Sequence, residues 1–518
     1  MDRREFLRIA GTGASLAILP GGYKIVEGSS EKNRTVGLER MRRGSPESQG
    51  IPSSAVISFI AEAEETLDAL HSVMIARNGH VVVEGWWAPW SAELNHMLYS
   101  LSKPFTATAI GIAQAEGRLS VDDRVLSFFP DERPEQPSRN LKAMTVRDLL
   151  RMTPGHEGSA DRAVMQPGDD AWTKAWLAYD VKHVPGTHWA YSNSVTYMLS
   201  AIIQKVTGAS LLDYLRPRLF DPLGIANPIW GNSPEGVTLG GFGLRIKTED
   251  ILRFGQLYLQ RGEWAGRRLV QEAWIAEATS RPAGGDPDSE GFGYQFWLNP
   301  GGSYGGGGAF GQLCSIIPDK HAVIAITAGV RLSAARAVLD LVQKHLIGHM
   351  GESPLPEQKA KHESLLRKLN DLSVTPPAGR SDSPLAAGVS GRKFEFSKNR
   401  HRMRSVTLAE RSGHTVLTVA DANGEHEFVC SNGTWIHGRT RFEAPIEGGL
   451  EALNPEREAP FAASGCWTAD DTFTLRICYT ESSPISTLTL RFEEQRVAFD
   501  RFINTRPMDR LSLVGSAS

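Results

Sequence analysis

Cysteine is scarce in this sequence, with four residues among 518. The cysteines lack the paired spacing of zinc fingers and no His-Glu-x-x-His segment occurs, so the sequence predicts no metal site and no cofactor. In an exported protein two of the four could form a disulfide, but they could equally be buried free thiols, and their spacing leaves both options open. The four are Cys314, Cys430, Cys466 and Cys478.

Long apolar runs and an excess of one charge are also missing. No run approaches the roughly 20 residues of a membrane-spanning helix, and the net charge of -3 is spread without a basic stripe. We therefore expect neither a transmembrane span nor a nucleic-acid partner. With 41% hydrophobic and 22% charged residues, the composition is that of a soluble globular protein, and the length predicts two folded units.

Residues 1–30 are expected to be an export signal and a flexible N-terminus. Arg3 and Arg4 precede Phe6, Leu7 and then a mildly apolar stretch, which is typical of a twin-arginine signal. Such a signal predicts a periplasmic or extracellular protein. A short amphipathic helix with a chance arginine pair is the alternative, and the cleavage site stays open.

Residues 45–350 mix strand and helix patterns. Val73–Ile75 and Val81–Val83 flank Asn78-Gly79, which is a strong hairpin signal. Strands near both ends with helices between them predict an α+β domain whose sheet is layered with helices and closed by distant segments. Further helices are expected at 106–116, 146–152, 195–206 and 249–259, and strands at 313–317 and 322–327.

The rest of the chain changes character. A charged helix and a Pro/Ser/Gly-rich stretch are expected to make 351–384 a helix and a linker. Residues 385–510 contain short alternating runs separated by turns such as Asn423-Gly424 and Asn432-Gly433. This pattern predicts an all-β barrel or sandwich as the C-terminal domain.

Ser100 and Lys103 stand at the start of the helix expected near 106. Residues three apart on a helix share one face, so the two side chains can touch. A neutral amine beside a serine hydroxyl can take its proton, and the first turn of a helix offers N–H groups to a developing oxyanion. A plain helix cap is the alternative for Ser100. The same spacing recurs at Ser29–Lys32 and Ser390–Lys393, without an apolar helix behind it.

A second element, Tyr191-Ser192-Asn193, precedes the apolar helix of 195–206. The Tyr191 phenol could relay a proton to a leaving group, and the Asn193 amide could hold Lys103 or the substrate. The alternatives are a buried tyrosine and a helix-capping asparagine.

Taken together, Ser100-Leu101-Ser102-Lys103 and Tyr191-Ser192-Asn193 resemble two motifs of the serine β-lactamase, penicillin-binding-protein and related esterase superfamily. The resemblance covers about 45–350. It implies a β-lactamase/transpeptidase-like fold, in which helices flank an antiparallel sheet and form a helical subdomain. It also implies that the C-terminal domain is like the lipocalin-like or barrel modules appended to some such hydrolases.

The third family motif, Lys or His then x then Gly, is where the sequence departs. The cation's position falls at Gly306 in one register and at Ser303 in another. In the family this cation meets the carboxylate of β-lactams and of peptide C-termini. Its absence favours an esterase or amidase acting on substrates without that carboxylate.

Several further positions are candidates for contact with the substrate. Ala309 and Gly308, together with Asn193, are candidate substrate or oxyanion contacts, because backbone N–H groups need no particular side chain. His156 and Tyr304 are candidate pocket residues, although His156 could simply cap a turn.

The sequence therefore predicts a serine hydrolase that cleaves an ester or amide through an acyl-enzyme on Ser100, with Lys103 and Tyr191 as proton-transfer groups. The expected partner is a small-molecule or short peptide-like substrate, and the oligomeric state stays open. A β-lactamase or D-Ala-D-Ala carboxypeptidase is one alternative. A non-catalytic ligand-binding or sensor protein that kept the fold is another.

Overall fold

One eight-stranded sheet joins strands from both ends of the first domain. The computed structural model describes residues 41–166, 171–281, 290–442 and 458–518, so the expected export signal lies outside the described residues. In spatial order the strands are β1 (Arg42–Arg43), β3 (His80–Trp86), β2 (Leu70–Arg77), β13 (Ala322–Ala328), β12 (Gln312–Ile317), β11 (Tyr304–Gly308), β10 (Trp297–Leu298) and β9 (Gly291–Phe292).

The predicted hairpin is confirmed as β2 and β3, which pair antiparallel. Asn78 and Gly79 have φ values of 49° and 75°, and a two-residue turn with positive φ at both positions matches the twist of the flanking strands. β13 lies between β2 and β12 and is buried throughout. Its side chains therefore alternate between two separate hydrophobic cores, one on each face of the sheet.

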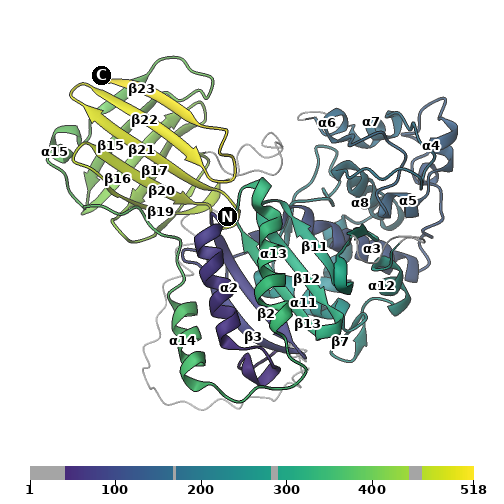
Figure 1. The fold of residues 1–518 in the computed structure, drawn as a ribbon. Coiled ribbons are helices and arrows are strands. Elements are labelled where there is room, and N and C mark those ends of the chain that lie inside the picture. The colour runs from purple at the N-terminus through teal and green to yellow at the C-terminus, as the bar shows by residue number, and fades with distance from the viewer. Residues whose placement is uncertain (1–40, 167–170, 282–289, 443–457) are drawn as a thin grey trace, which may run out of the picture. The chain divides into compact units, whose positions relative to one another are not determined.

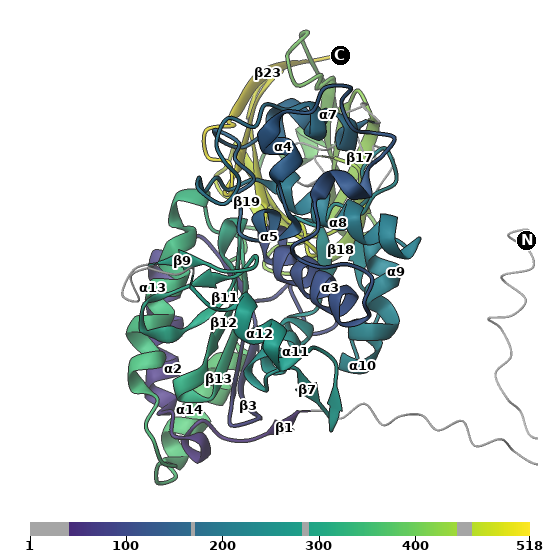
Figure 2. The ribbon, with the colours of Figure 1, turned by 90° about the vertical axis from the view of Figure 1, so that its right-hand side faces the viewer.

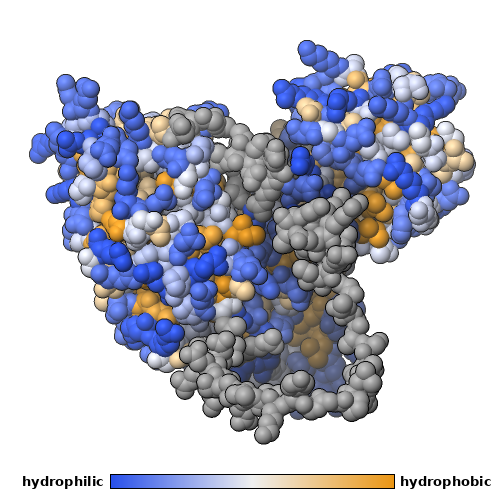
Figure 3. Space-filling model, turned by 180° about the vertical axis from the view of Figure 1, so that it is seen from behind, coloured by the Kyte–Doolittle hydropathy of each residue, from blue (hydrophilic) through white to orange (hydrophobic). Residues whose placement is uncertain are grey.

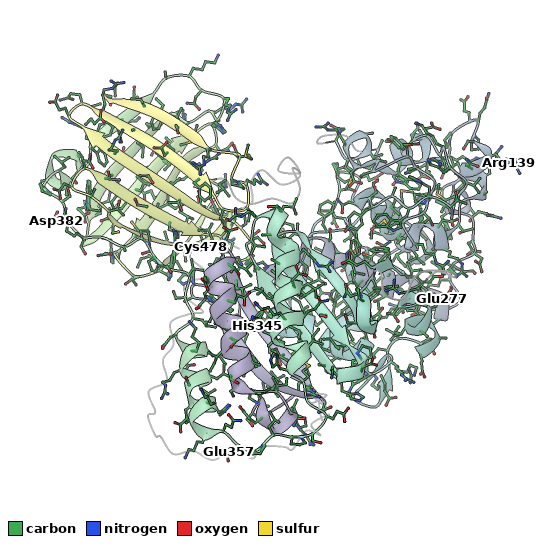
Figure 4. All side chains as sticks on the ribbon, viewed as in Figure 1. Arg139, Glu277, His345, Glu357, Asp382 and Cys478 are labelled. Carbon is green, nitrogen blue, oxygen red and sulfur yellow. The ribbon has the colours of Figure 1, made fainter. Side chains whose placement is uncertain are left out.

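Helices cover both faces of the sheet (Figure 1). α2 (Ser53–Thr66) and α13 (Ala335–His345) pack on one face, and α14 (Lys359–Asn370) packs on α2. His345, labelled in Figure 4, places its Nε2 atom 2.7 Å from Glu62 Oε2 and so links α13 to α2. α11 (Thr248–Leu259) lies on the opposite face, where Gly255 lets it approach Val323 and Cys314 closely.

A helical subdomain completes this half of the chain. α3 and α8 lie side by side within it (Figure 2), and α8 ends at Gly208, which has the left-handed conformation. Its helices, with α12 beside them, are α3 (Lys103–Ala115), α4 (Arg139–Ala143), α5 (Val146–Leu150), α6 (Asp161–Val164), α7 (Trp172–Ala178), α8 (Asn193–Thr207), α9 (Leu211–Leu215), α10 (Asp221–Leu223) and α12 (Glu272–Ala278). A small sheet of β4 (His96–Met97), β6 (Leu244–Ile246) and β5 (Ile229–Trp230) lies beside them.

The C-terminal part is a nearly closed antiparallel barrel, which confirms the all-β prediction. Its core is filled by aromatic and aliphatic side chains, and the turns at Asn423-Gly424 and Asn432-Gly433 separate strands as expected. In spatial order the ten strands are β17 (Gly424–Cys430), β16 (His414–Asp421), β15 (Ser405–Arg411), β14 (Lys393–Phe396), β23 (Leu511–Ala517), β22 (Arg496–Ile503), β21 (Ile485–Glu493), β20 (Thr472–Cys478), β19 (Ala459–Trp467) and β18 (Ile436–Thr440).

The segment between the sheet domain and the barrel is tied to both. Val374 N donates to Ala88 O, two residues beyond the end of β3, and Arg380 pairs with Trp467 of β19. Cys478, labelled in Figure 4, belongs to the same core as α2 and α13 although it ends β20. The described residues all fall in one compact unit.

All four cysteines are buried free thiols. The spacing had left open a disulfide or free thiols, and the structure has free thiols. Burial raises the pKa of Cys314 and of Cys430 to about 12.

Among the described residues, no single helix is long and apolar enough to cross a membrane. One pair of helices, α8 and the segment Leu211–Leu223, has the length and composition of a membrane span, but the two are bent by 70° relative to each other. Hydrophilic side chains dominate the surface seen from behind, with hydrophobic patches between them (Figure 3).

Candidate active site

Ser100 lies in a single 3-10 turn, η2 (Tyr99–Ser102), that continues directly into α3. Pro104 occupies the first turn of α3, where its missing N–H costs no hydrogen bond. Tyr99 has φ 48°, a conformation that non-glycine residues rarely adopt. The side chain of Ser102 fixes this turn, because its Oγ donates to Tyr99 O at 2.7 Å and accepts from Leu244 N at 3.2 Å.

Lys103 is 1% exposed and points its side chain at Ser100. Its Nζ atom lies 3.1 Å from Ser100 Oγ, 2.6 Å from Asn193 Oδ1 and 2.8 Å from Gly241 O. No described carboxylate forms an ion pair with it. In its neutral form the amine would donate its two N–H groups to the two carbonyl-type oxygens and direct its lone pair at the Ser100 hydroxyl. This arrangement suits a general base.

Asn193 is the first residue of α8 and does not cap that helix. The cap comes from a different helix, because Asp161 of α6 accepts from Asn193 N at 3.0 Å and from Ser194 N at 2.8 Å. Its carboxylate also accepts from Ser192 Oγ at 2.6 Å. Burial alone would raise the pKa of Asp161, but these hydrogen bonds hold the pKa below its ordinary value. Asp161 therefore fixes the position of Asn193, which in turn holds Lys103.

Tyr191 presents the face of its ring to Lys103, with Nζ 4.7 Å from the ring centroid. The ring stacks on Trp297, at 5.9 Å between centroids, and lies 6.2 Å from Phe292. Trp189 lies 5.9 Å from Phe292 and is 46% exposed. We call Trp189, Tyr191, Phe292 and Trp297 the aromatic wall.

The glycine strand β11 packs directly against η2, the turn that contains Ser100. A Cβ atom at Gly306 would overlap with Leu101, and one at Gly308 would overlap with Leu98 O. A side chain at position 306 would therefore collide with the residue that follows Ser100. Ser303, the other position considered for the family cation, is buried. Neither position places a cation beside Ser100.

Ala309 begins the turn η6 (Ala309–Gly311) that follows β11. The next residue, Phe310, has φ 65°, and its ring meets the ring of Tyr99 edge-on at 5.0 Å. The residues that adjoin Ser100 and Ala309 are thus in contact.

The other two candidate pocket residues make no hydrogen bond or ring contact with Ser100, Lys103 or Tyr191. His156 is 1% exposed between Trp176 and Tyr179, and burial lowers its pKa to about 4. Tyr304 is buried, and its hydroxyl donates to Tyr258 O at 3.3 Å.

Two residues of the cluster were missed by sequence reasoning. Gly241 lies in the glycine-rich run 240–243, which could have indicated a close backbone approach. Asp161 carries no local signal, because its partners lie more than 30 residues away. Among the described residues, no three His, Cys, Asp or Glu side chains gather as a metal ligand set.

Comparison with known proteins decides the family. The family model named Beta-lactamase matches residues 47–347, which is more than half of the chain. The chain belongs to the Beta-lactamase family. The β-lactamase/transpeptidase-like fold that the motifs implied is thereby confirmed.

Two relatives match parts of the chain at low sequence identity. The 6-aminohexanoate-dimer hydrolase of Paenarthrobacter ureafaciens is 23% identical over 293 residues, which are 52% of this chain and 72% of that protein. Protein flp of Staphylococcus aureus (strain MW2) is 27% identical over 164 residues, so the chain spans only 33% of its length. Those 164 residues are 29% of this chain.

Solved structures are similar at lower identity. The octameric penicillin-binding protein homologue from Pyrococcus abyssi has a TM-score of 0.46 at 18% identity, covering 89% of this chain and 98% of that one. The D-stereospecific amidohydrolase from Streptomyces sp. also has a TM-score of 0.46 at 18% identity, covering 57% of this chain and 99% of that one.

Proposed function

We propose that this member of the Beta-lactamase family is a serine hydrolase that cleaves an ester or amide through an acyl-enzyme on Ser100. The contact between Lys103 and Ser100 carries the proposal. The amine is buried, lacks a carboxylate partner among the described residues and reaches the hydroxyl at 3.1 Å. A lysine kept only for structure would more commonly be paired with an acid when it is this buried.

In the proposed reaction Lys103 takes the hydroxyl proton while Ser100 Oγ forms a bond to the substrate carbonyl carbon. Backbone N–H groups of Ser100 and Ala309 hold the oxyanion. The carbonyl carbon then loses its alcohol or amine, which receives a proton from Tyr191, and Tyr191 is reprotonated from Lys103. A water molecule then attacks the carbonyl carbon of the acyl-enzyme, giving a proton to Tyr191 or Lys103. Ser100 Oγ regains a proton as the acid is released.

The surroundings favour an uncharged, apolar substrate. The aromatic wall offers ring faces beside Lys103, and neither register of the third motif provides a cation to meet a substrate carboxylate. We therefore propose esters or amides with an apolar or aromatic group near the scissile bond, in preference to β-lactams and peptide C-termini.

A fluorophosphonate probe tests the nucleophile. Wild-type protein should be labelled, Ser100→Ala should not, and Ser127→Ala, at an exposed serine, should be labelled like wild type. Lack of labelling in the wild type would instead favour a non-catalytic binding or sensor protein.

Substrate class is tested with nitrophenyl esters against nitrocefin. Esters of apolar acids should give the higher kcat/KM, and faster turnover of nitrocefin would show that the substrate proposal is wrong while leaving the nucleophile intact.

We also propose that the protein is exported by the twin-arginine route. A fusion of residues 1–45 to a reporter that is active only after twin-arginine transport should be active, and replacing Arg3 and Arg4 by lysine should abolish that activity.

A further inference from the structure

Residues 479–484, which connect β20 to β21 and which we call the barrel loop, bring the barrel into contact with η2, the turn that contains Ser100. Thr480, Ser482 and Ser483 in this loop are at most 4% exposed. Loops at the end of a barrel are normally solvated, so burial of three hydroxyl side chains here needs a reason.

Ser482 provides the first contact. Its Oγ atom lies 3.1 Å from the Tyr99 hydroxyl, and one residue earlier Glu481 O accepts from Met97 N at 3.0 Å. Met97 and Tyr99 lead directly into Ser100. The barrel loop therefore touches the strained segment that presents the nucleophile.

Ser483 provides the second contact, on the oxyanion side. Its Oγ accepts from Gln312 Nε2 at 3.0 Å and donates to Ala328 O at 2.8 Å. The same Gln312 amide donates to Ala309 O at 3.0 Å. Gln312 is 2% exposed, so this side chain links the loop to the turn that carries the second candidate oxyanion N–H.

Both linked turns hold a residue with positive φ. Tyr99 and Phe310 have φ values of 48° and 65°, and their rings meet edge-on. Such conformations persist only where the surroundings over-determine them. The two rings and the two loop serines supply that surrounding structure.

We propose that the barrel loop is part of the catalytic framework, with Ser482 as a positioning residue that holds Tyr99, and so Ser100, in line with Ala309. This inference rests on the proposed function. In this proposal no residue of the barrel loop touches the reacting atoms. The loop acts only on the geometry of the turn that contains Ser100. The consequence is that the barrel loop is required for full turnover even though none of its residues supplies a reacting group.

The test measures the second-order rate of fluorophosphonate labelling, with kcat and KM for a nitrophenyl ester. Ser482→Ala should lower the labelling rate and kcat about tenfold, the usual scale for one lost hydrogen bond, with KM within twofold. Tyr99→Phe should also lower the rate, and the loss in the double variant should be smaller than the sum of the two single losses, because both variants remove the contact between Ser482 and Tyr99. Ser482→Thr keeps the hydroxyl and should recover most of the rate.

Thr468→Ala is the control, since this exposed barrel hydroxyl bonds Thr474 at 3.0 Å and should change nothing. Wild-type rates in Ser482→Ala, or losses that add in the double variant, would overturn the positioning role. An unlabelled wild type would instead overturn the proposed function itself, so the two failures are distinct. If Ser482→Ala does not fold, Tyr99→Phe measured against Ser482→Thr decides the question from the other partner.

Discussion

The side-chain nitrogen of Lys103 lies 3.1 Å from Ser100 Oγ, and its two other hydrogen bonds go to Asn193 and Gly241. With both N–H groups of a neutral amine donated to these oxygens, its lone pair faces the Ser100 hydroxyl. Lys103→Ala should lower kcat by about 10²–10⁴-fold, the scale of a lost general base. Lys103→Arg should be equally inactive, because a guanidinium stays protonated.

Steady-state hydrolysis of a nitrophenyl ester checks this prediction. Lys205→Ala is the matched control, because Lys205 is an exposed lysine paired with Glu132. Near-normal turnover in Lys103→Ala would refute the assigned base.

Asp161 should matter to both activity and stability. Asp161→Asn puts an amide group where two backbone N–H groups and a hydroxyl now donate, so at least one donor loses its acceptor. We expect about 1.5–3 kcal/mol less stability and lower kcat through displaced Asn193. Because the native pKa is below that of the unfolded chain, about 3.9, this stabilisation is present above the unfolded pKa and is lost as pH falls through the native value.

Denaturant unfolding of wild type and Asp161→Asn between pH 7 and pH 3 measures the effect. The difference should shrink at the acid end, whereas Asp213→Asn, at an exposed acid in the first turn of α9, should show little difference throughout. A gap that widens on acidification would contradict the assignment.

The Tyr191 hydroxyl and ring can be separated. Tyr191→Phe keeps the ring over Lys103 and the stack on Trp297 but removes the proton relay, so kcat should fall by about 10²-fold with a small change in KM. Tyr304→Phe is the matched control, because its hydroxyl bonds only Tyr258 O among the described atoms. Equal kinetics of the two variants would remove Tyr191 from the mechanism.

Trp189 should control substrate range. It is the most exposed member of the aromatic wall, and Trp189→Ala should raise KM for an aromatic acyl ester several-fold, in line with about 0.5–1.5 kcal/mol for an aromatic contact. The acetyl ester, which has no aromatic group to pack on the ring, should be hydrolysed as before. A uniform loss over both esters would indicate a folding defect, which thermal unfolding would reveal.

His156 should act on stability rather than on chemistry. Burial lowers its pKa to about 4, so between that value and about 6.5 the unfolded chain binds a proton that the native protein does not. Native stability therefore falls as pH drops through this window, by about 2 kcal/mol at pH 5 from this group alone. His156→Phe should lose less stability than wild type between pH 8 and pH 5, with near-normal kcat; parallel pH profiles would contradict this.

The sequence by itself determined the parts of this protein that depend on near neighbours. The hairpin at Asn78-Gly79 follows from turn chemistry, and the barrel strands follow from alternation of apolar residues. The meeting of Ser100 with Lys103 follows from their spacing at the start of a helix. Each of these signals is carried within a few residues, where helix and strand periods fix which side chains share a face.

Only the tertiary structure decided what surrounds that pair. Asp161 caps α8 from another helix, and Ser482 reaches Tyr99 across 383 residues of chain. Phe292 and Trp297 join Tyr191 because strands at the sheet edge bring them there. Periodicity within one segment carries no information about such contacts, since they depend on how separate cores pack against each other. The Ser100–Lys103 pair and the Tyr191-Ser192-Asn193 element could therefore be found in the sequence, whereas Asp161, Ser482 and the aromatic residues of the sheet edge could not.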